Sequence, residues 1–231
     1  MIYFQDAYKY DNKAINYSTN KIQYNDILNI QITSKNPEAV IPYNFDNTNF
    51  GRSNLIETLK FQGYLVSAEG TIVFPTVGPI KVIGKTTSEL EEHIETLLAD
   101  GGHVKDALVN IKILNSKVTV LGEVMKPGTF TITEENITFL QAIGYAGDLT
   151  INADRTNLLL IRDVDGIRKI ERIDLTDSKL LDSPAFFIKQ NDVIVVSPNL
   201  SRIKSTGFVG NIGTLVTISS IVVSTAILLS R

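Results

Sequence analysis

Residues Thr86 to Gly102 read TTSELEEHIETLLADGG, the clearest signal of local structure in the chain. The stretch opens with three preferred helix N-cap residues, and acidic side chains follow where they favour the positive end of the helix dipole. Apolar residues then recur on one helical face, namely Leu90, Ile94, Leu97 and Leu98. We therefore expect a helix that starts after these caps and stops at the glycine pair Gly101-Gly102.

Strand signals lie on both sides of this helix. Leu28, Ile30 and Ile32 alternate with other residues, which predicts a half-buried strand. A short helix follows Thr138 as its cap. The predicted strands lie at 27–33, within 65–83, and at 109–113, 117–124, 157–162, 167–173, 186–188 and 193–196. The chain is therefore predicted to be α+β, with strands dominating.

Turn residues separate the predicted strands of the second half. Asp165-Gly166 is a hairpin signal between two strands. Lys126 to Thr129 reads KPGT, which predicts a type II turn with positive φ at Gly128. One short motif occurs twice, as IQYNDIL at 22–28 and IKQNDVI at 188–194. In both copies we expect an Asn-Asp turn that leads into a buried strand, because asparagine tolerates the left-handed conformation.

Composition excludes several classes of protein. The 231 residues are 43% hydrophobic and 20% charged, which is typical of a folded chain. The net charge of −3 lacks the basic footprint of a nucleic-acid-binding protein, so no nucleic acid partner is expected. Cysteine is absent, which excludes disulfides, thiol nucleophiles and cysteine-based metal sites within this sequence.

No catalytic, cofactor or metal site is predicted. The sequence contains neither a Gly-x-Ser-x-Gly elbow nor a glycine-rich phosphate loop ending in Gly-Lys-Ser/Thr. A metal pair at His93 and His103 is the weaker interpretation, because their spacing alone does not support it. Four glutamates of the predicted helix are read as a solvated face rather than a cation site: Glu89, Glu91, Glu92 and Glu95.

The C-terminal segment has a different character. From Gly207 to Leu229 the chain carries no charge over 23 residues, which would form a helix of about 35 Å. That length exceeds the roughly 30 Å hydrocarbon core of a bilayer, so a transmembrane helix is predicted at 207–229. Small and hydroxyl residues fall on one stripe of this helix, at Gly210, Gly213, Thr217, Ser220 and Ser224.

Two interpretations of this stripe stay open. Small residues let membrane helices approach one another, and hydroxyls bond across helices or face water. The helix would then pack against copies of itself or line a polar lumen. In the alternative, the segment is a plain tail anchor whose serines and threonines bond back to their own helix.

The N-terminal residues give a weaker signal. Residues 1–18 are polar with scattered aromatics and predict a flexible arm. Met1 to Asp6 lacks the basic start and apolar run of a secretory signal. The aromatic side chains, Tyr3 and Phe4 among them, are interpreted as packing on a neighbouring surface, with stacking on sugar rings as the alternative.

Three motifs in order resemble one family. Residues 22–30 read IQYNDILNI, residues 66–80 read VSAEGTIVFPTVGPI with GKTT at 84–87, and residues 120–130 read VLGEVMKPGTF. They resemble the bacterial polysaccharide biosynthesis/export (Wza-like) proteins and the start of an SLBB β-grasp domain. The resemblance implies these boundaries: arm 1–18, polysaccharide export domain 19–115, SLBB domain 116–197, linker 198–206 and transmembrane helix 207–229.

The sequence departs from the family pattern at a few turn positions. Tyr24-Asn25 stands where the family usually has Pro-Gly, Glu69 where it has Asp, and Asn191 where it has Gly. Asparagine replaces a turn glycine at modest cost, so the fold implied by the resemblance is unchanged.

The resemblance implies a channel rather than an enzyme. Such proteins form homo-oligomeric rings, often octamers, with folded domains in the periplasm and C-terminal helices that cross the outer membrane. They carry capsular or extracellular polysaccharide handed over by an inner-membrane co-polymerase, often with a tyrosine kinase domain. Many begin as lipoproteins, so a removed leader and lipidated cysteine are expected before Met1. The alternative is a glycan-binding or scaffold module without a pore, held to a membrane by one helix; an enzyme ranks third.

Overall fold

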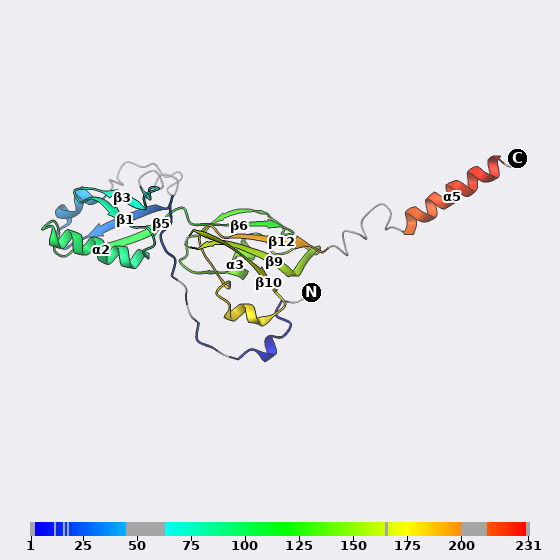
Figure 1. Ribbon diagram of the computed structural model, residues 1–231, viewed down its shortest axis with the longest axis horizontal. Helices are drawn as coiled ribbons and strands as arrows, with labels where there is room; N and C mark the ends of the chain where they lie inside the picture. The colour runs from blue at the N-terminus through cyan, green and yellow to red at the C-terminus, as the bar shows by residue number, and fades with distance from the viewer. Residues whose placement is uncertain are drawn as a thin grey trace.

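The chain folds around two separate hydrophobic cores. The computed structural model describes residues 3–11, 13–15, 17, 19–44, 63–164, 166–199 and 212–229. One core belongs to a first unit that contains β1–β5 and α2, and the other to a second unit that contains β6–β12 and α3 (Figure 1). Strands dominate over helices in both units, which confirms the predicted α+β class.

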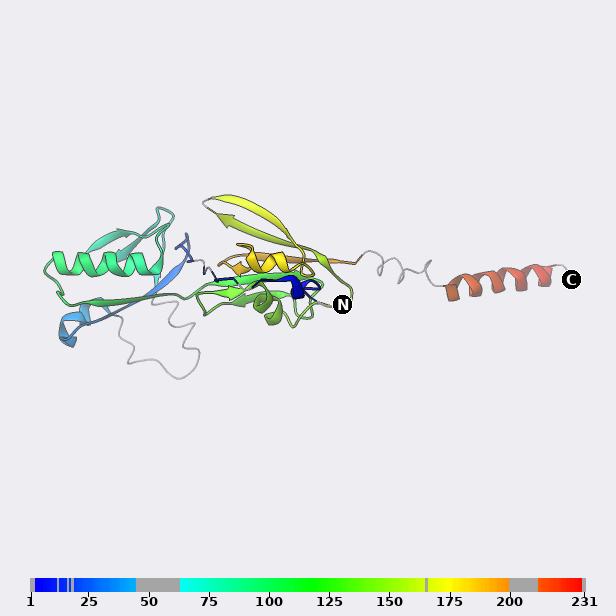
Figure 2. The same cartoon turned by 90° about the horizontal axis from the view of Figure 1, so that it is seen from below.

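The first unit is a small sheet that carries one long helix. Strands β2, β1 and β5 pair antiparallel in that order, and β3 and β4 form a separate hairpin. The buried faces of α2 and of β1 belong to one core, so the helix packs against this sheet (Figures 1 and 2). The elements are β1 Ile27–Thr33, β2 Tyr64–Leu65, β3 Thr71–Phe74, β4 Gly78–Lys81, α2 Thr87–Asp100, β5 Leu108–Ile113 and the 3₁₀ turn Pro37–Tyr43.

Helix α2 begins and ends as its sequence predicts. The Thr86 hydroxyl accepts the Glu89 amide at 3.2 Å, and the Glu89 carboxylate accepts the Thr86 amide at 2.8 Å, which completes a capping box. The apolar face is buried at positions 90, 94 and 98, each 0% exposed, whereas Leu97 is only partly buried. Burial of each of these side chains contributes about 1.5–3 kcal/mol to folding.

The second unit is a five-stranded mixed sheet with a short helix. The strand order is β10-β9-β12-β6-β7, in which β12 and β6 are parallel and the other pairs are antiparallel. Helix α3 is capped by Thr138, as predicted. The elements are β6 Lys117–Gly122, β7 Gly128–Thr131, β8 Ile137–Thr138, α3 Phe139–Tyr145, β9 Ala153–Val164, β10 Ile167–Ile173, β11 Phe187–Ile188, β12 Val193–Pro198 and the 3₁₀ turn Ser178–Asp182.

Turn predictions for this unit have mixed outcomes. The β9–β10 hairpin is confirmed, although Asp165 lies outside the described residues. The type II turn at 126–129 is wrong, because Gly128 does not take positive φ and instead begins β7. Positive φ occurs at Gly122, with a value of 89°, where β6 ends against the Val196 backbone. A side chain there would collide with that strand.

The N-terminal segment is tied to the second unit before it enters the first (Figure 1). The Phe4 amide donates to the Leu175 carbonyl at 2.9 Å, and the two carboxylate oxygens of Asp6 accept the Ser178 amide and hydroxyl at 2.8 and 3.0 Å. The flexible arm predicted for residues 1–18 is therefore a docked strap over the residues that the structure describes. Tyr3 and Phe4 pack on the second core, as expected of a packing role.

The last described element is α5, Ile212–Leu229. Within the described ranges, no helix is both long enough and apolar enough to cross a membrane. The predicted transmembrane helix at 207–229 is therefore not supported. The described part of this helix has 18 residues. Positions 207–211 lie outside the described residues.

Candidate functional site

The predicted stripe lies on α5, except that Gly210 is outside the described residues. Gly213 belongs to the helix, and Thr217, Ser220 and Ser224 are exposed in the single chain. The Ser220 hydroxyl donates to the Thr217 carbonyl at 2.8 Å, and the Ser224 hydroxyl donates to the Ser220 carbonyl at 2.7 Å. These bonds follow the back-bonding pattern of a plain helix, and they leave each hydroxyl oxygen able to accept a further bond.

The acidic face of α2 is more than a solvated surface. The Glu91 carboxylate accepts the Ile111 amide at 2.7 Å, and the Glu95 carboxylate accepts the Val109 amide at 2.9 Å. Both amides lie on the edge of β5 that has no partner strand in the three-stranded sheet. The interpretation of these two glutamates as purely solvated is therefore wrong, because they cap an open strand edge.

Metal ligands do not gather in the described part of the chain. Among those residues, no group of three or more His, Asp or Glu side chains could hold an ion. His103 instead packs its ring edge against Tyr43, with ring centroids 6.2 Å apart.

The repeated motif forms two matching turns, which we call the twin turns: Gln23–Asp26 and Lys189–Asp192. Asn25 and Asn191 both have φ of 64°, which confirms the predicted left-handed asparagines. The aspartate that follows each asparagine turns back to accept the amide at the start of its turn, from Gln23 at 2.7 Å and from Lys189 at 2.8 Å. The same local chemistry therefore introduces the core strands β1 and β12.

The twin turns contact each other where the two units meet, a region we call the junction. Gln190, which occupies the place of Tyr24 in the second motif, donates through Nε2 to Asp26 Oδ2 at 2.9 Å. Asn191 Nδ2 donates to Gln23 Oε1 at 3.0 Å. Burial raises the pKa of Asp26, and the bonds from the Gln23 amide and Gln190 oppose that rise. The junction thus centres on one buried polar pair, Asp26 and Gln190, rather than on a shared apolar core.

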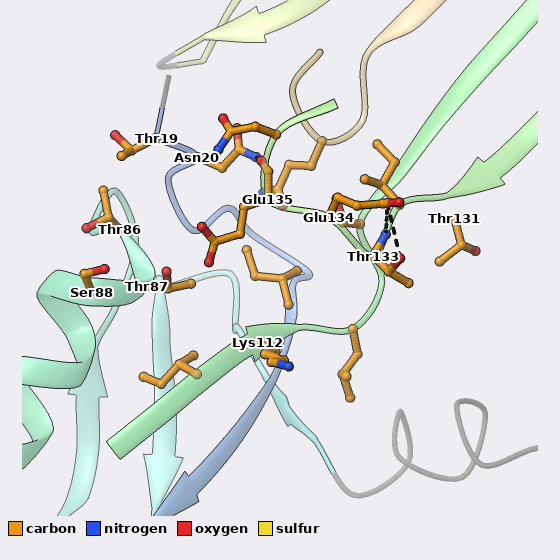
Figure 3. Close-up of a pocket in the computed structure, with 17 residues that line it drawn as sticks. Thr19, Asn20, Thr86, Thr87, Ser88, Lys112, Thr131, Thr133, Glu134 and Glu135 are labelled. Carbon is orange, nitrogen blue, oxygen red and sulfur yellow. Dashed lines mark hydrogen bonds between the residues drawn. The ribbon is translucent and has the colours of Figure 1, made fainter. Parts of the chain in front are cut away.

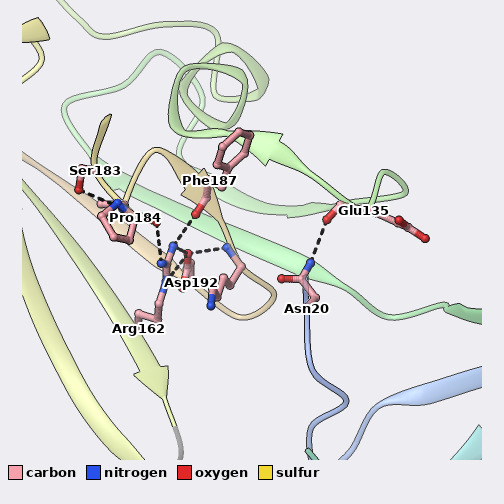
Figure 4. A network of polar contacts seen from close by, with 9 residues as sticks. Asn20, Glu135, Arg162, Ser183, Pro184, Phe187 and Asp192 are labelled. Atoms are coloured by element: carbon pink, nitrogen blue, oxygen red, sulfur yellow. Dashed lines mark hydrogen bonds and ion pairs between the residues drawn. The ribbon is translucent and has the colours of Figure 1, made fainter. Parts of the chain in front are cut away.

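Arg162 anchors the second twin turn from strand β9 (Figure 4). Its guanidinium donates to Asp192 at 2.6–3.1 Å and to the Phe187 carbonyl at 2.8 Å. The side chains of Arg162 and Asp192 are only 11% and 1% exposed. Burial raises the pKa of Asp192, and the contacts with Arg162 oppose that rise.

The two chain segments that connect the units are also hydrogen-bonded at the junction. Asn115 accepts the Ile27 amide at 2.9 Å and donates to the Asn25 carbonyl at 2.8 Å. On the strap, Asn20 Nδ2 donates to the Glu135 carbonyl at 2.9 Å (Figure 4). Both crossings are therefore fixed to a partner segment, which restrains the units relative to each other.

A cleft of about 510 Å³ opens beside the junction (Figure 3). This volume lies within the range of small-molecule sites, roughly 300–1,000 Å³. The first unit contributes the start of α2 and the end of β5, and the second unit contributes the loop that follows β7. Its walls are residues 86–88, 111–114 and 131–136, with Thr19, Asn20, Ser116 and Gln190.

Hydroxyl and carboxylate groups dominate the polar part of the cleft. Thr86, Thr87 and Ser88 face the loop that carries Glu134 and Glu135, and Lys112 is the single Lys or Arg among the lining residues (Figure 3). Hydrogen bonds from backbone amides hold the pKa of Glu134 below its ordinary value, so this carboxylate stays charged at neutral pH.

Sequence reasoning did not find this cleft. Its walls come from five segments that are distant in the chain, and only the α2 caps and Gln190 fall within the motifs identified from sequence. One signal in the sequence was Gln190, the third residue of the motif at 188–194. Its side chain has no role in the turn itself, which suggests a partner elsewhere.

Comparisons with known proteins agree with this division of the chain. A model of the polysaccharide biosynthesis/export protein family matches residues 15–114, and an SLBB domain model matches residues 116–196. The two matches follow each other in the order of the two units.

Curated relatives are similar over most of this chain. EPS I polysaccharide export outer membrane protein EpsA of Ralstonia solanacearum is 28% identical over 185 residues, which cover 77% of this chain and 48% of that protein. EpsA of Ralstonia nicotianae is 33% identical over 62% of this chain and 38% of that protein. Capsule polysaccharide export outer membrane protein CtrA of Neisseria meningitidis is 26% identical over 84% of this chain and 48% of that protein. The aligned part of the chain thus spans about half the length of these relatives or less.

Proposed function

We propose that this chain is a subunit of an outer-membrane machine that exports polysaccharide. The reason is that it matches the polysaccharide biosynthesis/export family and carries an SLBB domain. The observation that carries the proposal is the unbroken order of both family matches across residues 15–196. The relatives that match across most of this chain are named for polysaccharide export at the outer membrane. These relatives are named for export, and the matched family for biosynthesis and export.

The machine is an assembly of several copies of this chain. A polar polymer does not cross hydrocarbon unaided, so export needs a path that several subunits enclose. Copies joined head to tail close into a ring when the rotation between neighbours closes. In the proposed assembly the units lie in the periplasm, and polysaccharide arrives from an inner-membrane co-polymerase.

Helix α5 takes part in this assembly through its stripe. Gly213 and the hydroxyl residues at 217, 220 and 224 form a narrow face along which the backbone of a neighbouring helix could approach closely. The remaining apolar side chains of the helix then face outward. This role explains why small and hydroxyl residues recur at spacings of three and four along one face of the helix.

A second candidate is a glycan-binding or scaffold module that forms no pore. The observation in its favour is that the Ser220 and Ser224 hydroxyls bond back to carbonyls of their own helix, as they do in a plain tail anchor. Under this alternative the units bind polysaccharide or another export component, and the C-terminal helix holds the chain to a membrane.

Electron microscopy of the purified full chain in detergent separates the two candidates. The export assembly predicts closed rings with a central opening, whereas the scaffold predicts particles without one. A matched pair of variants then tests the stripe: Ser220→Leu lies on it, and Ser219→Leu lies on the other side of the same helix. Ring yield falls for Ser220→Leu and stays near wild type for Ser219→Leu; equal yields would exclude the stripe from assembly.

A further inference from the structure

The cleft beside the junction contains a buried acceptor without a protein partner among the described residues. Gln190 is 4% exposed and lines the cleft, and its Oε1 atom makes no hydrogen bond there. Its Nε2 atom donates to Asp26 and to the Lys21 carbonyl, which fixes the orientation of the amide. A buried carbonyl oxygen that lacks a donor carries a free-energy cost, and a ligand whose donor reached this oxygen would recover that cost.

The opposite wall of the cleft supplies donors. In α2 the capping box satisfies the amides of Thr86 and Glu89. The first four amides of a helix have no partner within it, so those of Thr87 and Ser88 stay available at this end. Both residues also line the cleft with their hydroxyl groups, and each hydroxyl both donates and accepts.

The charges on the cleft walls argue against an acidic ligand. Glu134 and Glu135 oppose the single cation, Lys112, so the lining carries one net negative charge. An ionised carboxylate can accept hydrogen bonds but cannot donate them. The two glutamates therefore favour a ligand that carries hydrogen-bond donors. The partly exposed side chains of Ile113 and Leu114 also line the cleft and give a non-polar surface.

We propose that this cleft binds a neutral saccharide segment of one or a few sugar rings. Sugar hydroxyls both donate and accept, so they match the loop carboxylates and Gln190 Oε1 as acceptors and the α2 amides as donors. The carbon-bearing face of a sugar ring matches the apolar end of β5. The choice of a polysaccharide-derived ligand rests on the proposed export function, which this site extends to a contact that each subunit makes with its cargo.

Isothermal titration calorimetry on the full chain in detergent tests the site. The probe is a set of oligosaccharides released by partial hydrolysis from the polysaccharide of the producing strain and made neutral by carboxyl reduction. We expect saturable binding at millimolar concentrations or below, and weaker binding of oligogalacturonate as the anionic comparison. Absence of saturable binding by the neutral fragments, or tighter binding of oligogalacturonate, would overturn the proposal.

Matched variants locate the binding. Thr87→Val removes one cleft hydroxyl from α2, and Thr96→Val makes the same change on the same helix outside the cleft. Loss of one hydrogen bond predicts about three- to tenfold weaker binding for Thr87→Val and no change for Thr96→Val. Glu135→Gln, at an exposed loop position, is a second test that does not perturb the helix, and it too weakens binding.

Two outcomes would assign the cleft differently. Unchanged affinity in both Thr87→Val and Glu135→Gln would exclude the cleft as the binding site. A cross-link from Glu135 to a neighbouring copy, with saccharide binding absent, would assign the cleft to a subunit contact. A strain that lacks this protein separates a failure of the binding site from a failure of the proposed export function. If deletion stops export but the fragments do not bind, only the site is excluded; if export continues after deletion, the export role itself is wrong.

Discussion

Replacing Arg162 by methionine removes the cationic partner of a carboxylate that is buried in the second unit. In the native chain Asp192 is 1% exposed and receives guanidinium bonds at 2.6–3.1 Å. Arg162→Met leaves that charge without its partner, and it also removes the donor to the Phe187 carbonyl. Breaking a buried pair in this way costs about 3–5 kcal/mol, so we expect a loss of that size in the free energy of unfolding.

Urea unfolding of the full chain, followed by circular dichroism, measures this loss. The double variant Arg162→Met/Asp192→Asn removes the charge together with its partner, and we expect it to lose only about 1–2 kcal/mol. The double variant should therefore be more stable than the single one. A loss below about 1 kcal/mol for Arg162→Met, or a double variant at least as unstable as the single, would refute this reasoning.

The pH dependence of the same variant gives an independent check. Burial already raises the pKa of Asp192, and loss of the guanidinium raises it further. A carboxyl whose folded pKa is raised contributes stability that is present at low pH and is lost as the pH rises through that pKa. The gap between wild type and Arg162→Met should therefore narrow as the pH falls. A gap that is constant across pH would show that Asp192 is not the source of the loss.

Three further predictions follow from burial, backbone geometry and capping. Ile94→Ala, at a position with 0% exposure, should lower the free energy of unfolding by about 2–5 kcal/mol in urea titrations. Gly122→Ala would place a Cβ atom 2.1 Å from the Val196 carbonyl oxygen and should sharply lower the melting temperature. Gly144→Ala, in the last turn of α3 where an added Cβ meets nothing within 4 Å, should instead stabilise by up to about 0.5–1 kcal/mol. Equal effects at the two glycines would contradict the backbone argument. Hydrogen bonds from Thr86 hold the pKa of Glu89 below its ordinary value. The ionised carboxylate therefore stabilises the fold at neutral pH, and this stabilisation is lost as the pH falls. Glu89→Gln should reduce the loss of melting temperature on the acid side, measured by thermal melts across pH.

Local structure was largely predictable because its determinants are adjacent in sequence. The capping box and the spacing of Leu90, Ile94 and Leu98 are enough to define α2, and alternation is enough to define β1. The left-handed asparagines at 25 and 191 were also predictable, because few other residues tolerate that conformation.

Features that depend on contacts between distant segments were not predictable. Positive φ was assigned to Gly128 from the Pro-Gly pair, but Gly122 needs it, since only the approach of β12 creates the constraint there. Glu91 and Glu95 appeared solvated because nothing local shows that the edge of β5 lies beside them.

The junction and the cleft also depend on contacts between distant segments, so they were not predictable from sequence. The repeated motif was visible, but its two copies do not reveal from sequence alone that they touch. Gln190 and Asp26 are separated by 164 positions, and their hydrogen bond depends on the packing of the two units. The cleft requires that packing as well, so its five wall segments could not be brought together from their residues alone.

The amount of polysaccharide at the cell surface, measured in a deletion strain with and without the full chain restored, tests the export role most directly. We predict that deletion removes surface polysaccharide while polymer accumulates inside the cell, and that the restored chain returns it to the surface. Surface polysaccharide at the wild-type level in the deletion strain would contradict the account.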